Sequence, residues 1–390
     1  MSGFRRVALI GGIIVLISVV ALAGLLLWWS PGKPKPIRDP ADGPLPGSVS
    51  EKIWVDINGV RQGMVIRGKN EQNPVLLWVH GGPGMPDYLL TELYPTNLED
   101  LFTVVWWDQR GTALSYDADI PPETMTIEQF ISDTLAVTDY LRQRFNQEKI
   151  YLLGHSWGSL IAIEAAARSP QRYHAYLGMA QMVYQLRSEK LAYDYMIAEY
   201  RKRGDTTMVR DLEAAPVSMT TGTPDAYLKL RDKAMHRLGV GTTHDMKSVI
   251  TGLFLPSWKF PGYTLREKVN LWRGRAFSRS FGLWDQLIWI DLRERIPTLK
   301  IPVYLLEGRY DYTCVTDLAR DYFRELNAPM KGFTSSATRL TVPFWRSRKR
   351  RTGSCREMCW PEPAPRLTSD NTPHCTELSG VSRSHSDNPR

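Results

Sequence analysis

The stretch YLLGHSWGSL, Tyr151 to Leu160, decides the fold assignment. An apolar run ends at Gly154, a serine follows two residues later, and a helix-like run of small apolar residues, LIAIEAAA, comes after Gly158. In such a G-x-S-x-G pattern a buried strand turns at once into a helix, and the glycines let the backbone pass close to its neighbours. We therefore predict that Ser156 is a nucleophile exposed above a sheet.

Other apolar runs indicate what surrounds this turn. PVLLWVH, FTVVWWDQ and IPVYLLE are short and apolar throughout, a further strand is expected at Ala175 to Met179, and a helical pattern covers Ile127 to Phe145. Alternating residues on both sides of Asn58-Gly59 predict a hairpin. Buried strands that alternate with helices are typical of a mostly parallel sheet covered on both faces. The predicted fold class is therefore α/β.

The pattern changes between Tyr184 and Phe281, which are helix-like with little strand character and predict a helical insertion. The strand signal returns at Ile301 to Glu307, and a helical stretch follows from Val315 to Leu326. We expect six parts: residues 1–29, a cytoplasmic stub and membrane anchor; 30–50, a linker; 51–183, the first part of the core; 184–283, a helical cap; 284–333, the second part of the core; and 334–390, an aberrant tail.

The N-terminal region contains an uncharged run of 23 residues, Val7 to Trp29, preceded by two arginines. As a helix it spans ~34 Å, enough for a hydrocarbon core of ~30 Å. The positive flank predicts a single-pass membrane protein with a cytoplasmic N-terminus and an exported catalytic body. A cleaved signal peptide is the alternative, because Ala21-Leu22-Ala23 resembles a cleavage site. Ser30 to Ser48, dense in Pro and Gly, predicts a semi-stiff spacer.

Composition excludes some classes of function. The formal net charge is +8, but residues 334–390 hold ten Lys or Arg and five Asp or Glu, so +5 of the excess lies in the tail. A basic tail beside a near-neutral body gives no reason to expect nucleic-acid binding. Three of the four cysteines also lie in the tail, which leaves Cys314 in the body and implies no disulfide framework.

A glycine-rich loop, His80-Gly81-Gly82-Pro83-Gly84, follows the strand PVLLWV. Its small side chains would let backbone N–H groups approach a substrate carbonyl oxygen. We predict that the N–H groups of Gly82 and Trp157 form an oxyanion hole, and an ordinary Gly/Pro turn is the alternative.

The motif WDQRG contains Asp108 and Arg110 after another strand. An aspartate two residues before an arginine at a strand end predicts a structural ion pair that fixes loops. We therefore assign Asp108 no chemical role.

Taken together, HGGPG, WDQRG, GHSWGSL and the later GRYDYT resemble, in order and separation, the proline iminopeptidase branch of the α/β-hydrolase superfamily. The resemblance extends from about Trp54 to Phe333. It implies a serine hydrolase with a helical cap, a catalytic triad in the order Ser, Asp, His, and release of an N-terminal residue from peptides. One departure is Ala113, where the family has a glycine, and we expect it to alter a loop only.

The resemblance also places the catalytic acid. Asp311 follows the strand IPVYLLE by a short loop, where the fold has its acid, and would hold an imidazole in the right tautomer. A turn aspartate without this role is the alternative. Asp317 and Asp321 fall inside the helical pattern and are expected at the surface.

The base is missing from the expected place. A serine needs a neighbour that accepts its proton, and histidine is the usual one. We expect His155 to point away from the turn, His174 to precede a strand, and two cap histidines to lie at the surface. By resemblance the base should lie near Thr338, but no histidine is found there. The seven histidines are His80, His155, His174, His236, His244, His374 and His385.

The sequence after Phe333 no longer resembles a hydrolase, with a run RSRKRR, clustered cysteines and an end rich in Ser, Pro, Asn and Thr. One explanation is a change of reading frame: a shift by two bases across Ala337 and Thr338 can encode His-Ser-Pro and then Leu-Glu-x-Pro-Glu. A natural alternative tail is the rival, in which a zinc site is conceivable although the spacing matches no standard finger. Its ligands would be Cys355, Cys359, His374 and Cys375.

The sequence thus predicts a serine hydrolase without cofactor or metal, acting on small peptides or esters and impaired in this chain by the absent histidine. Aminopeptidase activity is the first hypothesis and esterase activity on the same scaffold the second. The third is a non-catalytic surface binding protein, which would never react at Ser156.

Overall fold

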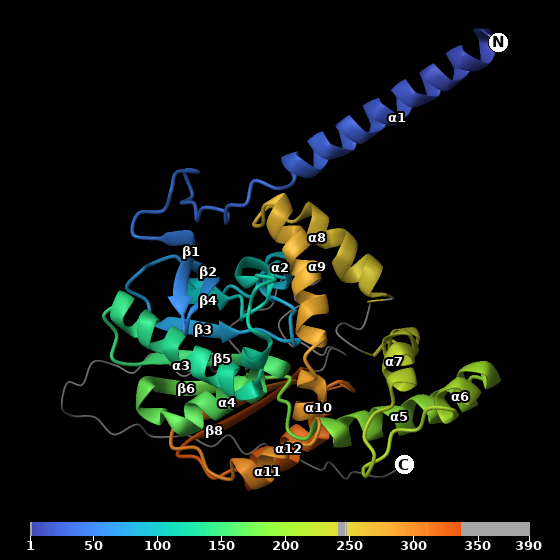
Figure 1. Ribbon diagram of the computed structural model, residues 1–390. Helices are drawn as coiled ribbons and strands as arrows, with labels where there is room; N and C mark the ends of the chain where they lie inside the picture. Colours follow the sequence, from blue (N-terminus) through green and yellow to red (C-terminus); the bar gives the residue numbers. More distant parts are fainter. Residues whose placement is uncertain (1, 241–245, 247, 310, 337–390) are drawn as a thin grey trace, which may run out of the picture. The chain divides into compact units, whose positions relative to one another are not determined.

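A single eight-stranded sheet forms the centre of the protein in the computed structural model, which describes residues 2–240, 246, 248–309 and 311–336 (Figure 1). Its strand order is β1-β2-β4-β3-β5-β6-β7-β8; the pairs β1–β2 and β2–β4 are antiparallel and all others parallel. This confirms the predicted mostly parallel α/β sheet. The strands are β1 Val49–Ile57, β2 Val60–Gly68, β3 Val75–Val79, β4 Thr103–Trp107, β5 Ile150–His155, β6 Tyr173–Met179, β7 Val303–Gly308 and β8 Lys331–Ser336.

The sequence explains the central strands. Every residue of β3 and β4 is buried, since helices cover both faces and leave no position for a polar side chain. The β1–β2 hairpin turns at Asn58 and Gly59, both with positive φ (49° and 75°), which suits Asn-Gly and fixes the register at Ile57 opposite Val60.

Helices form the outer layers and the cap. α3 and α4 pack on each other beside the sheet, and α12 packs on β7 and β8 (Figure 1). Between β6 and β7 the chain is helical, as predicted. The helices are α1 Ser2–Trp28, α2 Tyr88–Leu93, α3 Ile127–Arg144, α4 Trp157–Arg168, α5 Gln185–Lys202, α6 Thr206–Glu213, α7 Asp225–Leu238, α8 Leu255–Lys259, α9 Leu265–Arg279, α10 Leu283–Leu287, α11 Leu292–Arg295 and α12 Thr316–Glu325; short 3₁₀ turns are η1 Leu98–Asp100, η2 Ala113–Ser115, η3 Pro122–Thr124 and η4 Pro170–Arg172, and η5 Ile250–Phe254 is a π-helical turn.

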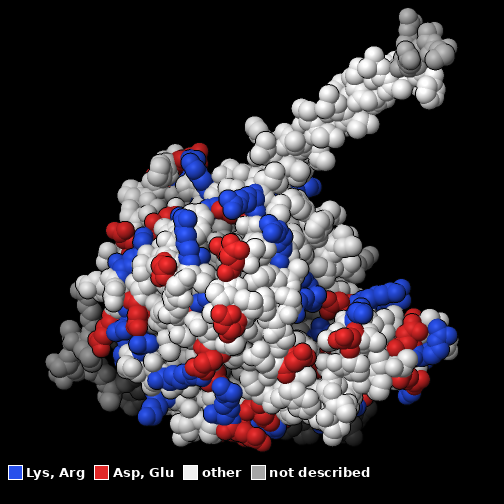
Figure 2. All heavy atoms as spheres, viewed as in Figure 1, with Lys and Arg blue, Asp and Glu red and all other residues white. Residues whose placement is uncertain are grey.

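The first helix differs from all the others. Val7–Trp28 is long and apolar enough to cross a membrane, and none of its most apolar window is buried in the protein. Figure 2 shows its described side chains as an uncharged surface, whereas acidic and basic side chains mix over the body. A signal sequence would meet the same criteria of length and composition.

The segment after α1 makes contacts that its composition did not predict. The Gly32 N–H donates to Pro261 O at 3.0 Å, and Ser50 Oγ donates to Lys35 O at 2.7 Å. The predicted spacer is therefore hydrogen-bonded to the body. Proline and glycine reveal a lack of regular structure, but they carry no information about such long-range bonds.

Strand β8 extends past the point where the family resemblance ends. It continues through Ser336, which pairs with Gly308 at the end of β7. The predicted aberrant tail thus begins with three residues, from Thr334, that still belong to the sheet.

Candidate active site

Ser156 lies at the turn between β5 and α4, as the motif predicts. Its backbone has φ 50° and ψ −120°, a conformation that non-glycine residues rarely adopt and that costs of order 1–3 kcal/mol. The Ser156 N–H donates to Met179 O at 2.9 Å, which anchors the turn to β6. The side chain is half-buried, so its hydroxyl stays at the edge of the packed interior.

The two glycines of the motif permit close backbone contacts that a side chain at either position would prevent. A Cβ atom at Gly158 would lie 2.1 Å from Val79 O and 2.5 Å from His80 O, and one at Gly154 would lie 2.6 Å from Gly158 O. The turn and the end of β3 therefore touch through backbone atoms. This contact brings the start of the HGGPG loop against the start of α4.

A buried aspartate outside the predicted set joins the loop to the turn. Asp87 Oδ2 lies 2.7 Å from His155 Nδ1 and accepts hydrogen bonds from Trp78 Nε1 at 3.0 Å and Gly81 N at 3.3 Å. Burial alone would raise the pKa of Asp87, but the charge of His155 and its hydrogen bond lower it. The side chain of His155 is thus bonded to Asp87, in agreement with the prediction that it points away from the turn. Asp87 follows the loop without a motif of its own, so no sequence signal identified it.

His80 is held as a neutral imidazole. Its Nδ1 donates to Gly81 O at 2.7 Å and its Nε2 accepts from the Gln109 N–H at 3.1 Å, while burial lowers its pKa to about 4. Gln109 also donates to His80 O and accepts from Trp157 Nε1 at 2.9 Å. His80 and Gln109 therefore fix the two segments that carry the predicted oxyanion-hole amides of Gly82 and Trp157.

Asp311 lies three residues beyond β7 and has one free carboxylate oxygen. Its Oδ1 accepts from Thr313 N at 2.7 Å and Cys314 N at 2.9 Å, and its buried Oδ2 has no hydrogen-bond partner in the described part of the chain. Burial raises the pKa of Asp311 to about 7. An unpartnered buried oxygen is costly, and a donor such as an imidazole N–H would satisfy it.

Cys314 connects the predicted acid, Asp311, to the predicted nucleophile, Ser156. Its Sγ lies 3.9 Å from Ser156 Oγ, and burial, followed by the charges of Asp311 and Glu307, raises the pKa of the thiol well above its usual range. A thiol that stays protonated cannot accept the serine proton. This contact therefore supplies no base.

The expected position of the base, Thr338, lies outside the described residues. The last described residue, Ser336, pairs with Gly308, and Asp311 follows Gly308 by three residues. Because β7 and β8 are parallel, the chain leaves β8 at the same edge of the sheet as the loop that carries Asp311, which we call the acid loop.

One predicted ion pair is wrong. Arg110 pairs with Asp133 of α3, with Nε–Oδ2 and Nη2–Oδ1 distances of 2.9 Å, and not with Asp108. Asp108 instead accepts from Leu114 N and from the Tyr263 hydroxyl, both at 3.0 Å, and burial raises its pKa to about 7. Arg110 lies in a turn beyond the end of β4, where the regular alternation of side chains has stopped, so a separation of two residues does not bring it to Asp108. Asp108 still has a structural role.

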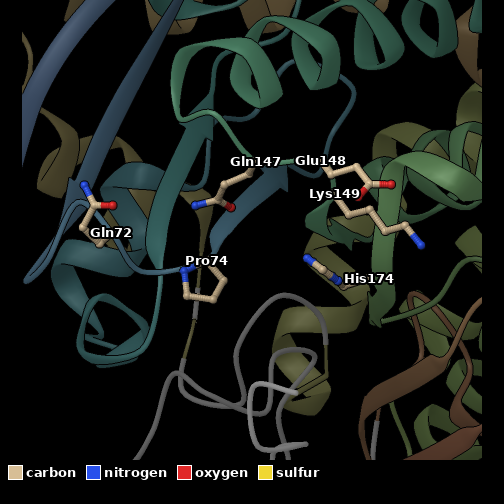
Figure 3. A pocket seen from close by; sticks show the side chains of 6 residues that line it. All are labelled: Gln72, Pro74, Gln147, Glu148, Lys149 and His174. Carbon is tan, nitrogen blue, oxygen red and sulfur yellow. The ribbon is translucent and has the colours of Figure 1, made fainter. Parts of the chain in front are cut away.

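Two further histidine predictions need correction. His236 was expected at the surface but is 9% exposed. His174 is the second residue of β6 rather than a residue before it, and it lines an open pocket of about 510 Å³ with Gln72 and Lys149 (Figure 3). That pocket lies at the amino ends of the parallel strands, the opposite sheet edge from Ser156, so it is separate from the candidate active site.

The described residues contain no group of His, Cys, Asp or Glu side chains arranged to hold a metal ion. The zinc ligands considered for the tail, Cys355, Cys359, His374 and Cys375, lie outside the described residues. His244 lies outside them as well.

A buried ionic group in the cap reaches the acid loop. Glu189 of α5 binds Arg231 of α7 through two contacts of 2.7 Å and accepts from the Tyr227 hydroxyl at 2.8 Å. Gln185 Nε2 donates both to Glu189 Oε1 at 2.8 Å and to Thr313 O at 3.0 Å. The cap and the loop that carries Asp311 are therefore held together.

The sheet order, the serine turn and the acid loop are those of a hydrolase scaffold. A family model described as alpha/beta hydrolase fold matches residues 74–330, and the chain belongs to this family. It is 32% identical over 279 residues to the probable aminopeptidase YbaC of Bacillus subtilis, which covers 71% of this chain and 86% of that protein.

Other similar proteins carry related names. The proline iminopeptidase of Flavobacterium johnsoniae is 28% identical over 254 residues, covering 63% of this chain and 76% of that protein. The solved structure of a proline iminopeptidase-related protein from Thermus thermophilus has a TM-score of 0.49 and 21% identity, covering 74% of this chain and 89% of that one.

Proposed function

We propose that this α/β hydrolase uses Ser156 as its nucleophile and Asp311 as its acid, and that its family activity is release of an N-terminal residue from small peptides. The observation that carries the proposal is the strained Ser156 backbone, with its hydroxyl 3.9 Å from the side chain of Cys314, whose N–H binds the carboxylate of Asp311. Strain of this kind persists where the surrounding structure imposes it, commonly at active sites.

The mechanism assigns one task to each group. Ser156 Oγ attacks the substrate carbonyl carbon, and the N–H groups of Trp157 and Gly82 stabilise the charge on the carbonyl oxygen. Trp157 is the first residue of α4, where N–H groups have no partner inside the helix. The free Oδ2 of Asp311 would orient the imidazole that takes the serine proton.

This chain lacks a histidine at the position expected for that imidazole, since none occurs between Ala337 and Pro373. We therefore propose that its hydrolase activity is strongly impaired. Loss of one triad member typically leaves ~10³ to 10⁴-fold catalysis over the reaction in water. A change of reading frame after Phe333 would account for both the missing histidine and the composition of the tail, and sequencing the gene across Lys331 to Cys355 tests it. A frame confirmed as printed would rule that explanation out.

The aminopeptidase assignment is tested with a substrate panel. Aminoacyl-naphthylamides and short-chain nitrophenyl esters are compared at the same concentration, with Ser156→Ala as the background. Turnover of the amides alone, above that background, supports the peptidase. Turnover of the esters alone contradicts it.

One observation favours esterase activity as the second candidate. A peptidase that selects a free N-terminus must bind an ammonium group, for which a carboxylate is the natural partner. The buried carboxylate of Glu189 is already engaged by Arg231, Tyr227 and Gln185. An ester substrate would need no such partner.

We further propose that α1 is an uncleaved, single-pass anchor with the catalytic body outside the cytoplasm. The length of its apolar run, Val7–Trp28, the two arginines that precede this run and the tryptophans at its end support this. Alkaline carbonate extraction and protease treatment of spheroplasts test it. A full-length chain that resists extraction and is digested from outside is expected, whereas release as a shortened soluble protein would indicate a signal peptide.

A further inference from the structure

A buried lysine binds the segment that follows α1. The amine of Lys268, on the first turn of α9, donates to Trp29 O at 2.7 Å, Ser30 Oγ at 2.9 Å and Trp258 O at 2.7 Å. The residue is fully buried, and none of these three partners is a carboxylate. Burial lowers its pKa to about 8, so the bonds, rather than an opposing charge, hold the amine there.

Neighbouring contacts extend this attachment. Pro31 forms an isolated bridge with Thr264, and Gly32 N donates to Pro261 O at 3.0 Å. Gly32 has φ +69°, and a Cβ atom there would lie 2.3 Å from Thr264 Cγ2, so the backbone approaches the cap closely. The Trp29 ring lies under the amine of Lys259, 5.5 Å away. Residues 29–32, which follow α1, thus form one packed unit with the α8–α9 turn.

This attachment limits how far the cap can lie from a membrane crossed by α1. Gly32 follows the last residue of α1, Trp28, by four residues, which span at most ~14 Å when extended. Tryptophans at the end of a span lie at the interface between lipid and water. Pro261, bonded to Gly32, must therefore lie within about that distance of the interface.

The surface next to this attachment is suited to lipid. Ile250 is 62% exposed and Leu255 is 53% exposed, and Leu93 of α2 is exposed as well. Lys259, which lines one pocket with Leu255 and Leu93, is exposed, and so is Lys33, the residue after Gly32. Leu255 and Leu93 of α2 both line an open pocket of about 360 Å³. We call Ile250, Leu255, Leu93, Lys33 and Lys259 the α8 face.

We infer that the α8 face rests in the headgroup layer of the bilayer that α1 crosses, as a second membrane contact of this protein. The inference rests on the proposed anchor. Apolar side chains gain free energy at the boundary between headgroups and acyl chains, and each lysine near an anionic surface adds ~1 kcal/mol. Neither contribution to the binding free energy needs to be large, because α1 already holds the α8 face close to the bilayer.

The contact reaches the candidate active site through α9. At the far end of this helix, a Cβ atom at Gly84 of the glycine loop would lie 2.8 Å from Ser278 Oγ and 3.2 Å from Arg275 Cα. Lys268 and Ser278 are ten residues apart, ~15 Å along the helix axis. The cap thus links the bilayer surface to the loop that carries the predicted oxyanion hole, which favours substrates present at that surface.

Photocrosslinking tests the inference on the full chain. p-Benzoylphenylalanine is placed at Leu255, and at Met330 as the matched control, since Met330 is 56% exposed but precedes β8 at the opposite sheet edge. Both proteins are assembled in nanodiscs of phosphatidylcholine and phosphatidylglycerol that contain an alkyne-bearing phosphatidylcholine. Both positions are exposed, so the replacements leave the core intact.

We expect the Leu255 protein to form at least five times more lipid adduct than the Met330 protein. Equal adduct from chains that stay in the discs under alkaline carbonate would overturn the inference and leave the anchor standing. Chains that leave the discs under carbonate would overturn the anchor and the inference together.

Discussion

The Sγ atom of Cys314 lies 3.9 Å from the Oγ atom of Ser156, which brings the loop after β7 to the turn after β5. Since the backbone amide of Cys314 also donates to Asp311, one residue contacts both Asp311 and Ser156. The arrangement brings the proposed nucleophile and the proposed acid onto neighbouring loops, and leaves the buried Oδ2 of Asp311 without a hydrogen-bond partner in the described part of the chain. This geometry is the basis of the predictions that follow.

Asp311 makes stability depend on pH. Its native pKa of about 7 exceeds the value of ~4 for an aspartate in an unfolded chain, so between these values the native state binds the extra proton. The free energy of unfolding should therefore fall as the pH rises from ~4 to ~7. Asp311→Asn should match the parent at pH 4 and exceed it by ~4 kcal/mol at pH 8. Denaturant titrations at both values measure this, and an unchanged pH profile in the variant would contradict it.

Gly158→Ala should disrupt the candidate active site. The added Cβ would collide with Val79 O and His80 O, both backbone atoms that cannot turn away. We expect a loss of more than ~3 kcal/mol in stability together with the loss of any reaction at Ser156. Gly43→Ala is the control, since its Cβ would meet its nearest atom at an ordinary 3.4 Å. Equal Tm values for the two variants would argue against the close approach.

Ala113→Gly should stabilise the protein. Ala113 has φ 36°, in the left-handed region that disfavours a side chain. Relief of this strain exceeds the entropy that glycine adds to the unfolded chain, for a gain of ~0.5–1 kcal/mol. Chemical denaturation measures the gain. Ala167→Gly, in helix α4, should instead lose ~1 kcal/mol, and a loss of similar size at Ala113 would refute the strain.

Asp133→Ala should destabilise the protein, because Asp133 of α3 is the buried partner of Arg110. The substitution removes the buried partner of the guanidinium and leaves its charge unpaired, at a cost of ~3–5 kcal/mol. Asp321→Ala breaks an exposed pair with Arg324 and should change stability by less than ~0.5 kcal/mol. Thermal unfolding of both proteins provides the comparison, in which similar Tm shifts would be the unexpected result.

Much of this fold could be predicted because its signals are local. The apolar runs before Gly154 and His80 are buried strands, since only a covered parallel sheet accepts such runs. The turn at Ser156 could be predicted for the same reason: its glycines and the adjacent strand and helix lie within ten residues.

The other features of the fold and the site could not be predicted, because they depend on contacts between segments that are distant in sequence. Asp87 pairs with His155, 68 residues away, and Arg110 pairs with Asp133 on a helix whose sequence shows only amphipathic spacing. Lys268 binds Trp29 across 239 residues, so the proline-rich linker could not be distinguished from a free spacer. Composition and periodicity describe neighbouring residues, so they do not predict which distant residues will pair.

The most direct test of the account is the reaction of the full chain with a fluorophosphonate in detergent, with and without added imidazole, followed by peptide mapping. Imidazole can take the place of an absent histidine between Ser156 and Asp311. We predict slow modification of Ser156 that imidazole accelerates at least tenfold, no modification in Ser156→Ala, and loss of the acceleration in Asp311→Asn. Failure to modify Ser156 under either condition, or a rate that imidazole does not change, would contradict the account.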